Sequence, residues 1–259
     1  NSKLYATPST TMAVDLAFKN ADLSVRGYSG NNDGTTTAQE IIDALPAAQR
    51  QLKGTLGFGV GTNVDFFHTA PMLDESTISA TQQANTAAYR SAVEAVSAII
   101  FQIQELNGDS ENNTNDVMSD LTNDLADGEI DGQTDGQETT AYPTEALDVL
   151  EQDPSTLPIP GDDSGRTVGQ VKDLVIQETS DTGSQTDTSE FEEDTAAIEL
   201  KPAETNPDLD ADGIENADDA FPENVAASVD VDADGLPDDW NSDCDATCQT
   251  NSELTLDDD

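Results

Sequence analysis

Apolar residues recur at helical spacing through the first two thirds of the chain. The clearest run covers residues 81–108, and its apolar face consists of Tyr89, Val93, Val96, Ile100 and Ile103. Spacings of three and four place these side chains on one side of a long helix. A coiled-coil seam for a partner chain and the core face of a helical bundle both produce this pattern. We favour the core face.

Two earlier segments show signals for the start of a helix. Residues 9–22 begin with Ser and Thr capping candidates after Pro8 and continue with helical apolar spacing. Thr37 and Glu40 have the spacing of a capping box, which predicts a second helix. Because proline lacks the backbone donor, we expect Pro46 to end or kink this helix before it resumes.

Helical spacing continues beyond residue 108 in shorter segments. Residues 112–128 are amphipathic, with a glycine at their end, and further helices are expected over 143–153 and 167–178. The chain is therefore expected to be mainly α, with a helical domain over residues 1–178.

Residues 179–206 are Ser, Thr, Asp and Glu with few apolar side chains. Such a segment cannot bury enough apolar surface to offset the entropy lost on ordering. We expect a flexible acidic linker here, followed by a third segment over residues 207–259.

Two acidic stretches in the third segment follow one pattern. They read DLDADGIENADDAFP from residue 208 and DVDADGLPDDWN from residue 230. Aspartates stand at positions one, three and five, a glycine follows, and Asp or Asn stands at positions nine and twelve. Ca²⁺ takes about six to eight oxygen ligands, and a glycine lets the chain reverse with positive φ. The pattern predicts two calcium sites, and the alternative is a disordered acidic tail.

The pattern matches an EF-hand loop only in part. An EF-hand closes on a bidentate Glu at position twelve, where this chain has Asp219 and Asn241. The flanking sequences contain prolines and resist helix formation. Mg²⁺ is less expected than Ca²⁺, because it keeps more water and a stricter geometry.

The two stretches resemble thrombospondin type 3 repeats, in the form found in secreted and surface proteins of aquatic bacteria. The resemblance covers residues 207–248 and implies that calcium replaces a hydrophobic core while cysteines staple the chain. It implies one site lined by Asp208, Asp210, Asp212, Asn216 and Asp219, and another lined by Asp230, Asp232, Asp234, Asp238 and Asn241. The array is short, and Asn241 departs from the family pattern. A site at the edge of an array can share ligands with a next repeat.

Charge narrows the range of partners. The 259 residues include 54 acidic and 9 basic side chains, for a formal net charge of −45. Such a surface repels nucleic acid and anionic membranes and attracts cations. No apolar run reaches about 18 residues, so no transmembrane segment is expected. The sequence shows no signal peptide, and its two ends suggest a piece of a longer chain.

The two cysteines, Cys244 and Cys248, both lie in the acidic tail. With no histidine nearby they are poor zinc ligands. A local disulfide in an oxidising compartment is favoured over free thiols.

Candidate catalytic groups are few. His68 is the one histidine, and packing or a surface position is favoured over catalysis for it. GFGVG at 57–61 lacks the preceding strand and the lysine of a phosphate loop and is interpreted as a turn. In DGEIDGQTDG, residues 127–136, every aspartate precedes a glycine, and turns are favoured over a further cation site. These aspartates are Asp127, Asp131 and Asp135.

The stretches TPSTTMAVDLA, AAYRSAVEAVSAIIFQI and DLADGEIDG are similar to parts of uncharacterised lipoproteins of marine gammaproteobacteria. This second resemblance implies placement at the cell surface. We therefore expect a non-catalytic calcium-binding structural protein, a stalk or spacer that is extracellular or on the bacterial outer surface. The alternatives are an adhesion module that binds a glycan or protein partner, a subunit of an extracellular filament, and an accessory part of an enzyme.

Overall fold

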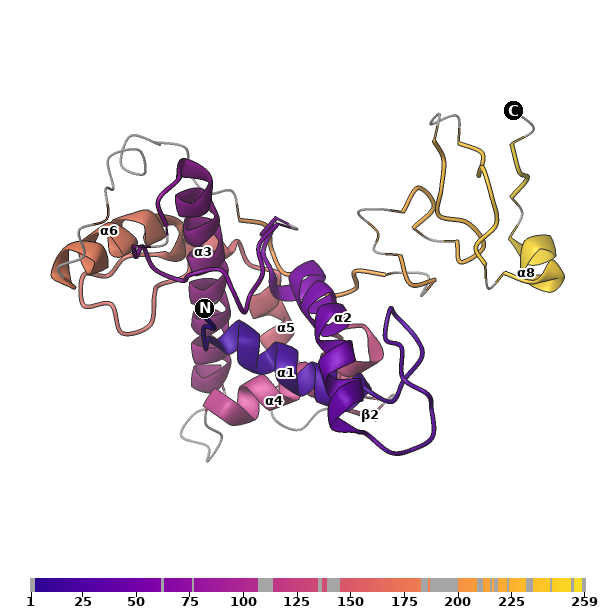
Figure 1. Ribbon diagram of the computed structural model, residues 1–259, viewed down its shortest axis with the longest axis horizontal. Coiled ribbons are helices and arrows are strands. Elements are labelled where there is room, and N and C mark those ends of the chain that lie inside the picture. Colours follow the sequence, from indigo (N-terminus) through magenta and orange to yellow (C-terminus); the bar gives the residue numbers. More distant parts are fainter. Residues whose placement is uncertain are drawn as a thin grey trace.

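The computed structural model describes most of the chain. The described residues are 3–61, 63–75, 77–106, 114–134, 137–138, 145–182, 186, 200–208, 212–214, 216, 219–222, 224–231, 235–242, 244–252 and 254–257. The chain is mainly helical, as predicted (Figure 1). Its helices are α1 (Pro8–Asn20), α2 (Ala38–Leu56), α3 (Ala80–Leu106), α4 (Thr114–Asp124), α5 (Glu145–Leu150), α6 (Val171–Asp181) and α8 (Ala246–Asn251).

Short elements complete the fold. They are the 3₁₀ turns η1 (Leu125–Asp127), η2 (Pro154–Thr156) and η3 (Val168–Gln170), and the antiparallel pair β1 (Gln133–Thr134) and β2 (Gln137–Glu138).

The long helix α3 runs through the helical domain and contacts α1, α4, α5 and α6 (Figure 1). Its predicted apolar face is buried, and the largest side chain on it, Tyr89, is fully inaccessible to solvent. Ile103, at the other end of this face, is also fully buried. The interpretation of this face as the core of a helical bundle is confirmed.

Tyr89 also anchors two segments through its hydroxyl group. This hydroxyl donates a hydrogen bond of 2.8 Å to the carbonyl oxygen of Phe66, and it lies 2.8 Å from Oγ1 of Thr7. The rings of Tyr89 and Phe66 stack with their centroids 5.3 Å apart. A buried tyrosine requires such a polar partner, and here the partners fix the start of α1 against α3.

The cap of α1 differs from the prediction by one turn. Thr7, not Ser9 or Thr10, is the capping residue, and its Oγ1 accepts a hydrogen bond from the backbone nitrogen of Thr10. Pro8 occupies the first helical position, where its fixed φ suits a helix and its missing N–H costs nothing. The proline therefore starts this helix instead of preceding it.

The capping box that was predicted for α2 is present. The backbone nitrogen of Thr37 donates to Oε2 of Glu40 at 2.8 Å, and the reciprocal bond measures 3.2 Å. Pro46 does not end the helix, which continues from Ala38 to Leu56. Ala44 and Ala47 are both buried on either side of the proline, and this packing offsets the lost backbone bond.

The amphipathic helix predicted over 112–128 is confirmed as α4 with the 3₁₀ turn η1. Gly128 ends it in the left-handed conformation with φ 117°, and its amide donates to the carbonyl of Leu125. This is the geometry for which a glycine at a helix end is favoured.

An ion-pair network fastens α6 to α3. Arg90 on α3 donates from two guanidinium nitrogens to Glu178 on α6, at 2.8 and 2.9 Å, and from Nε to Glu94 at 2.7 Å. A third contact runs from Arg90 to the carbonyl of Pro71 at 3.2 Å. Such a fork holds both carboxylates in defined positions.

The predicted linker, residues 179–206, is bound to the helical domain at both of its ends. Helix α6 continues to Asp181, and residues 200–206, which we call the seam, are hydrogen-bonded to the helical domain. The seam amides of Lys201, Ala203 and Glu204 donate to the carbonyls of Phe58, Leu150 and Thr55 at 3.0, 3.2 and 2.9 Å. Residues 183–185 and 187–199 lie outside the described residues.

The acidic tail beyond residue 207 lies to one side of the helical domain (Figure 1). Within its described residues, the buried apolar side chains are Ala226, Ala227, Pro237 and Cys244. Since so little apolar surface is buried, hydrophobic packing contributes little to the tail.

Candidate functional site

The two acidic repeats form loops with the same hydrogen bonds, 22 residues apart. The amide of Gly213 donates to Oδ2 of Asp208, and the amide of Gly235 donates to Oδ2 of Asp230, both at 2.9 Å. Both glycines are left-handed, with φ 93° and 89°, so the glycine after the third aspartate makes the predicted reversal.

A second pair of bonds closes both loops at position nine. The amide of Asn216 donates to the carbonyl of Pro207 at 2.7 Å, and the amide of Asp238 donates to the carbonyl of Val229 at 3.0 Å. The shared spacing in the sequence therefore corresponds to a shared loop geometry.

Carboxylates approach one another in the first loop. Burial raises the pKa of Asp212, and the negative charges of Asp219 and Asp208 raise it further. Asp219 is only 9% exposed, and its Oδ1 accepts the amide of Phe221 at 2.7 Å. A bound cation stabilises neighbouring carboxylates that otherwise repel.

Among the buried oxygens in this part of the chain, Oδ1 of Asp208 and Oδ1 of Asn206 accept no hydrogen bond from the described residues. A buried oxygen without a partner is costly. Carboxylate and amide oxygens are the donor types that Ca²⁺ prefers.

The predicted ligands are only partly described. Asp210, Asp232 and Asp234 lie outside the described residues. Within the described ranges, no three His, Cys, Asp or Glu side chains converge closely enough to hold a metal.

Asn241 forms hydrogen bonds to the first repeat. Its Nδ2 donates to Oδ2 of Asp212 in that repeat and to the carbonyl of Val225. Its Oδ1 accepts from Oγ of Ser228 at 2.7 Å. This amide therefore connects the two repeats, whereas Asp238 stays in its own loop, where its Oδ2 accepts the amide of Val231.

The cysteines form the expected disulfide. Cys244, just before α8, is bonded to Cys248 within α8, whose first turn is capped by the carboxylate of Asp245. The amides of Thr247 and Cys248 donate to this carboxylate and hold its pKa below the ordinary value.

His68 is a surface residue. Its side chain is half exposed, and Nδ1 lies 3.0 Å from Oδ2 of Asp65. The stretch at 57–61 is a turn, as predicted, with Phe58 and Gly59 both at positive φ.

The described part of the DGEIDGQTDG stretch, residues 127–134, surrounds a buried carboxylate that the sequence did not reveal, and Asp135 lies outside the described residues. Asp124 is fully buried and accepts the amides of Asp131, Gly132 and Gln133 at 3.1–3.3 Å. Burial raises the pKa of Asp124 to about 7, against the lowering effect of the amides. A signal existed, because Asp124 stands seven residues after Val117 and therefore on the apolar face of α4.

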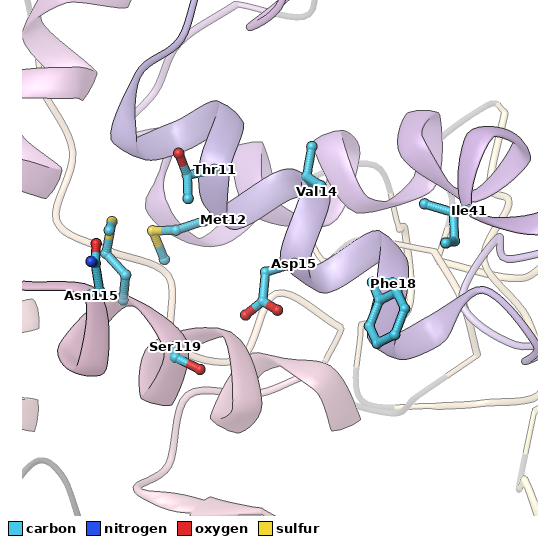
Figure 2. A pocket seen from close by; sticks show the side chains of 9 residues that line it. Thr11, Met12, Val14, Asp15, Phe18, Ile41, Asn115 and Ser119 are labelled. Carbon is cyan, nitrogen blue, oxygen red and sulfur yellow. The ribbon is translucent and has the colours of Figure 1, made fainter. Parts of the chain in front are cut away.

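An apolar groove of about 480 Å³ lies between α1, α2 and α4. Figure 2 shows Val14, Phe18 and Ile41 on one part of its wall, and Met12 near Asn115 on another. Phe18 and Val14 are 58% and 46% exposed.

The chain was compared with protein-family models, with curated proteins and with solved structures, and none of them matched. In the part of the chain that the structure describes, no helix is both long and apolar enough to cross a membrane.

Proposed function

We propose that the chain is a non-catalytic, calcium-binding structural protein, secreted or on the cell surface, in which the acidic repeats serve as a metal-stabilised spacer. The observation that supports this most directly is the shared geometry of the two loops. Asp208 and Asp230 each bind the amide of the glycine five residues later, and both glycines are left-handed.

The side chains that we assign to the first site carry the donor type that calcium prefers. Asp208, Asp212, Asn216 and Asp219 offer the hard oxygens that Ca²⁺ takes, and one oxygen of Asp208 is buried without a hydrogen bond. The proposal assigns the position-one and position-five aspartates to the metal in both loops. Calcium would supply the cohesion that the few buried apolar residues of the tail do not.

The disulfide supports a location outside the cytosol. Disulfides persist in oxidising compartments and are rare in the cytosol. Cys244 and Cys248 are bonded at the end of the tail that contains the loops. An extracellular position also provides the millimolar calcium that weak sites need.

Calcium titration of the complete chain by calorimetry tests this proposal. We expect two sites in the wild type, one site after Asp208→Asn and one after Asp230→Asn. Asp163→Asn makes the same chemical change at an exposed turn of the helical domain and serves as the control. Calcium should also slow proteolysis of the tail relative to chelator. No calcium binding by the wild type, or an equal loss in the control, would reject the proposal.

A second candidate function, a binding module, is favoured by the apolar groove. Because the chain has a net charge of −45, we propose a basic, partly apolar protein segment as the occupant. The groove wall also includes Asp15, whose carboxylate accepts from Lys19 and Thr122.

Fluorescence titration with an amphipathic lysine–leucine peptide tests the groove. Phe18→Ala should weaken binding of this peptide, whereas Ile78→Ala, at a side chain that is 80% exposed and outside the groove, should not. Equal affinity for both variants would exclude the groove as the binding surface.

A further inference from the structure

The basic side chains of this acidic chain are unevenly placed. Among the described residues, ion pairs within the helical domain join Lys3 to Asp74, Lys19 to Asp15, Arg90 to Glu94 and Glu178, and Arg166 to Asp162. Another four lie where the first repeat meets the helical domain. We call these four the basic junction: Arg26, Arg50, Lys53 and Lys201.

Two cavities bring the basic junction against the first repeat. A small cavity of about 90 Å³ is lined by Arg26 and Arg50 from the helical domain and by Asp208 and Gly213 from the first loop. These last two residues are the pair whose hydrogen bond defines the loop.

The neighbouring cavity, of about 440 Å³, is lined by Lys53 and Lys201 together with Asn216 of the loop. Pro207 lines both cavities. All four basic residues therefore surround the point where the tail leaves the helical domain.

The local backbone places Arg26 and Arg50 at this point. Arg26 has φ 48°, an uncommon value for a residue with a Cβ, and the next residue, Gly27, has φ 76°. Nη2 of Arg26 donates to the carbonyl of Ala126 at 2.8 Å. A Cβ on Gly27 would lie 2.8 Å from a guanidinium nitrogen of Arg50, so the glycine leaves room for this side chain. Strain of this kind persists where the surrounding structure requires it.

We infer that the basic junction supplies positive charge that balances the first acidic loop. In the absence of metal, this charge holds the loop against the helical domain. When calcium is present, the same charge competes with it for Asp208. This inference rests on the proposed function. Positive charge beside a carboxylate stabilises it as an anion and opposes the approach of a divalent cation to the same group. The first loop should therefore bind calcium more weakly than its own ligands would allow.

The described residues of the second loop line neither of these two cavities. No Lys or Arg follows Lys201, and in Figure 1 the chain beyond residue 225 lies farther from α2 than the segment that begins at residue 200. The two loops share a geometry but differ in their surroundings. Calcium should consequently occupy the second loop first and the first loop at higher concentration.

Calorimetry of the full chain with the pair Arg26→Gln and Arg50→Gln tests the competition. In the Asp230→Asn background, which leaves the first loop, we expect about fivefold tighter calcium binding. In the Asp208→Asn background, which leaves the second loop, we expect no change. The control pair, Arg166→Gln and Lys172→Gln, changes the net charge equally and lies away from the loops.

The outcomes separate this inference from the proposed function. A wild type that binds no calcium rejects the proposed function, and the competition with it. The inference alone is rejected if the first loop binds calcium equally tightly with and without Arg26 and Arg50. It is also rejected if the double variant shifts calcium affinity equally in the Asp208→Asn and Asp230→Asn backgrounds. The single variant Arg50→Gln changes only an exposed side chain, so it should fold even if the double variant does not. It should strengthen calcium binding by the first loop by a smaller factor than the double variant does.

Hydrogen exchange of the calcium-free chain tests whether the basic junction holds the first loop against the helical domain. The amide of Gly213 should exchange faster in the Arg26→Gln, Arg50→Gln variant than in the wild type, while the amide of Gly235 should not change. Equal exchange of the Gly213 amide in the two proteins would overturn the seating of the loop by the basic junction.

Discussion

The helical domain and the acidic tail are held together by different forces. In the helical domain, large side chains such as Tyr89, Phe66 and Leu16 are fully buried around α3. The described tail buries two alanines, a proline and a disulfide-bonded cysteine as its apolar side chains. Hydrogen bonds that loop amides donate to carboxylates shape it instead. The helical domain therefore has its own source of stability, whereas the tail depends on charge, covalent linkage and, in our proposal, a cation.

The largest expected effect is a loss of stability that is confined to the helical domain. Ile103→Ala removes buried methyl groups from α3 and leaves a cavity, which should lower the free energy of unfolding by about 2–5 kcal/mol. Denaturant unfolding followed by far-ultraviolet circular dichroism measures this loss.

The matched control is Ile78→Ala, at a side chain that is 80% exposed. It should change the stability by less than about 0.5 kcal/mol. If Ile103→Ala also abolished calcium binding by the tail, the two regions would not be independent.

The next effect concerns pH and Asp124. Its pKa is raised from 3.8 to about 7 in the folded chain. Between pH 4 and pH 7 the unfolded chain releases this proton while the folded chain keeps it, so the contribution of Asp124 to stability decreases as pH rises through that window. The total change should be at most a few kcal/mol, because three amides oppose the shift.

Thermal unfolding of the wild type and of Asp124→Asn across this pH range measures the contribution. From pH 4 to pH 7 the wild type should lose stability relative to Asp124→Asn. Above pH 7 the difference between the two proteins should stay constant. Asp163→Asn, at an exposed turn, should leave the pH profile unchanged. A difference that is constant with pH would contradict the raised pKa.

The smallest effect is confined to the tail. Cys244→Ser with Cys248→Ser opens a loop of four residues, and so short a loop limits the stabilisation to about 2 kcal/mol. Proteolysis of the tail should become faster, whereas unfolding of the helical domain should not change. Wild type treated with a reducing agent should behave like the double variant. A loss of stability in the helical domain would show that the regions are coupled.

Local patterns predicted the helices well. The apolar face of α3, the capping box at Thr37 and the end of α4 at Gly128 depend on residues within one or two turns of each other. We expected the helix to end or kink at Pro46 and then resume, and it continues to Leu56. Buried alanines on both sides of the proline compensate for its missing donor, and that burial is a property of the packed domain.

Long-range contacts were not predictable in the same way. The amide of Asn241 reaches Asp212 across 29 residues, and the seam binds carbonyls such as that of Phe58, far earlier in the chain. No periodicity encodes these partners. The same holds for the basic junction, because Arg26 and Lys201 are distant in sequence and meet only where the tail joins the helical domain.

The seam gives the molecule a defined mechanical path. Its amides donate hydrogen bonds to carbonyls at the end of α2, in the turn after α2 and at the end of α5. In addition, the carbonyl of Thr205 accepts a hydrogen bond from the amide of Ile130 at 2.7 Å. Because the seam lies between the tail and α6 along the chain, a pull on the tail reaches these bonds before it reaches α6. The bond nearest the tail in sequence joins Thr205 to Ile130, so tension would first enter the helical domain there.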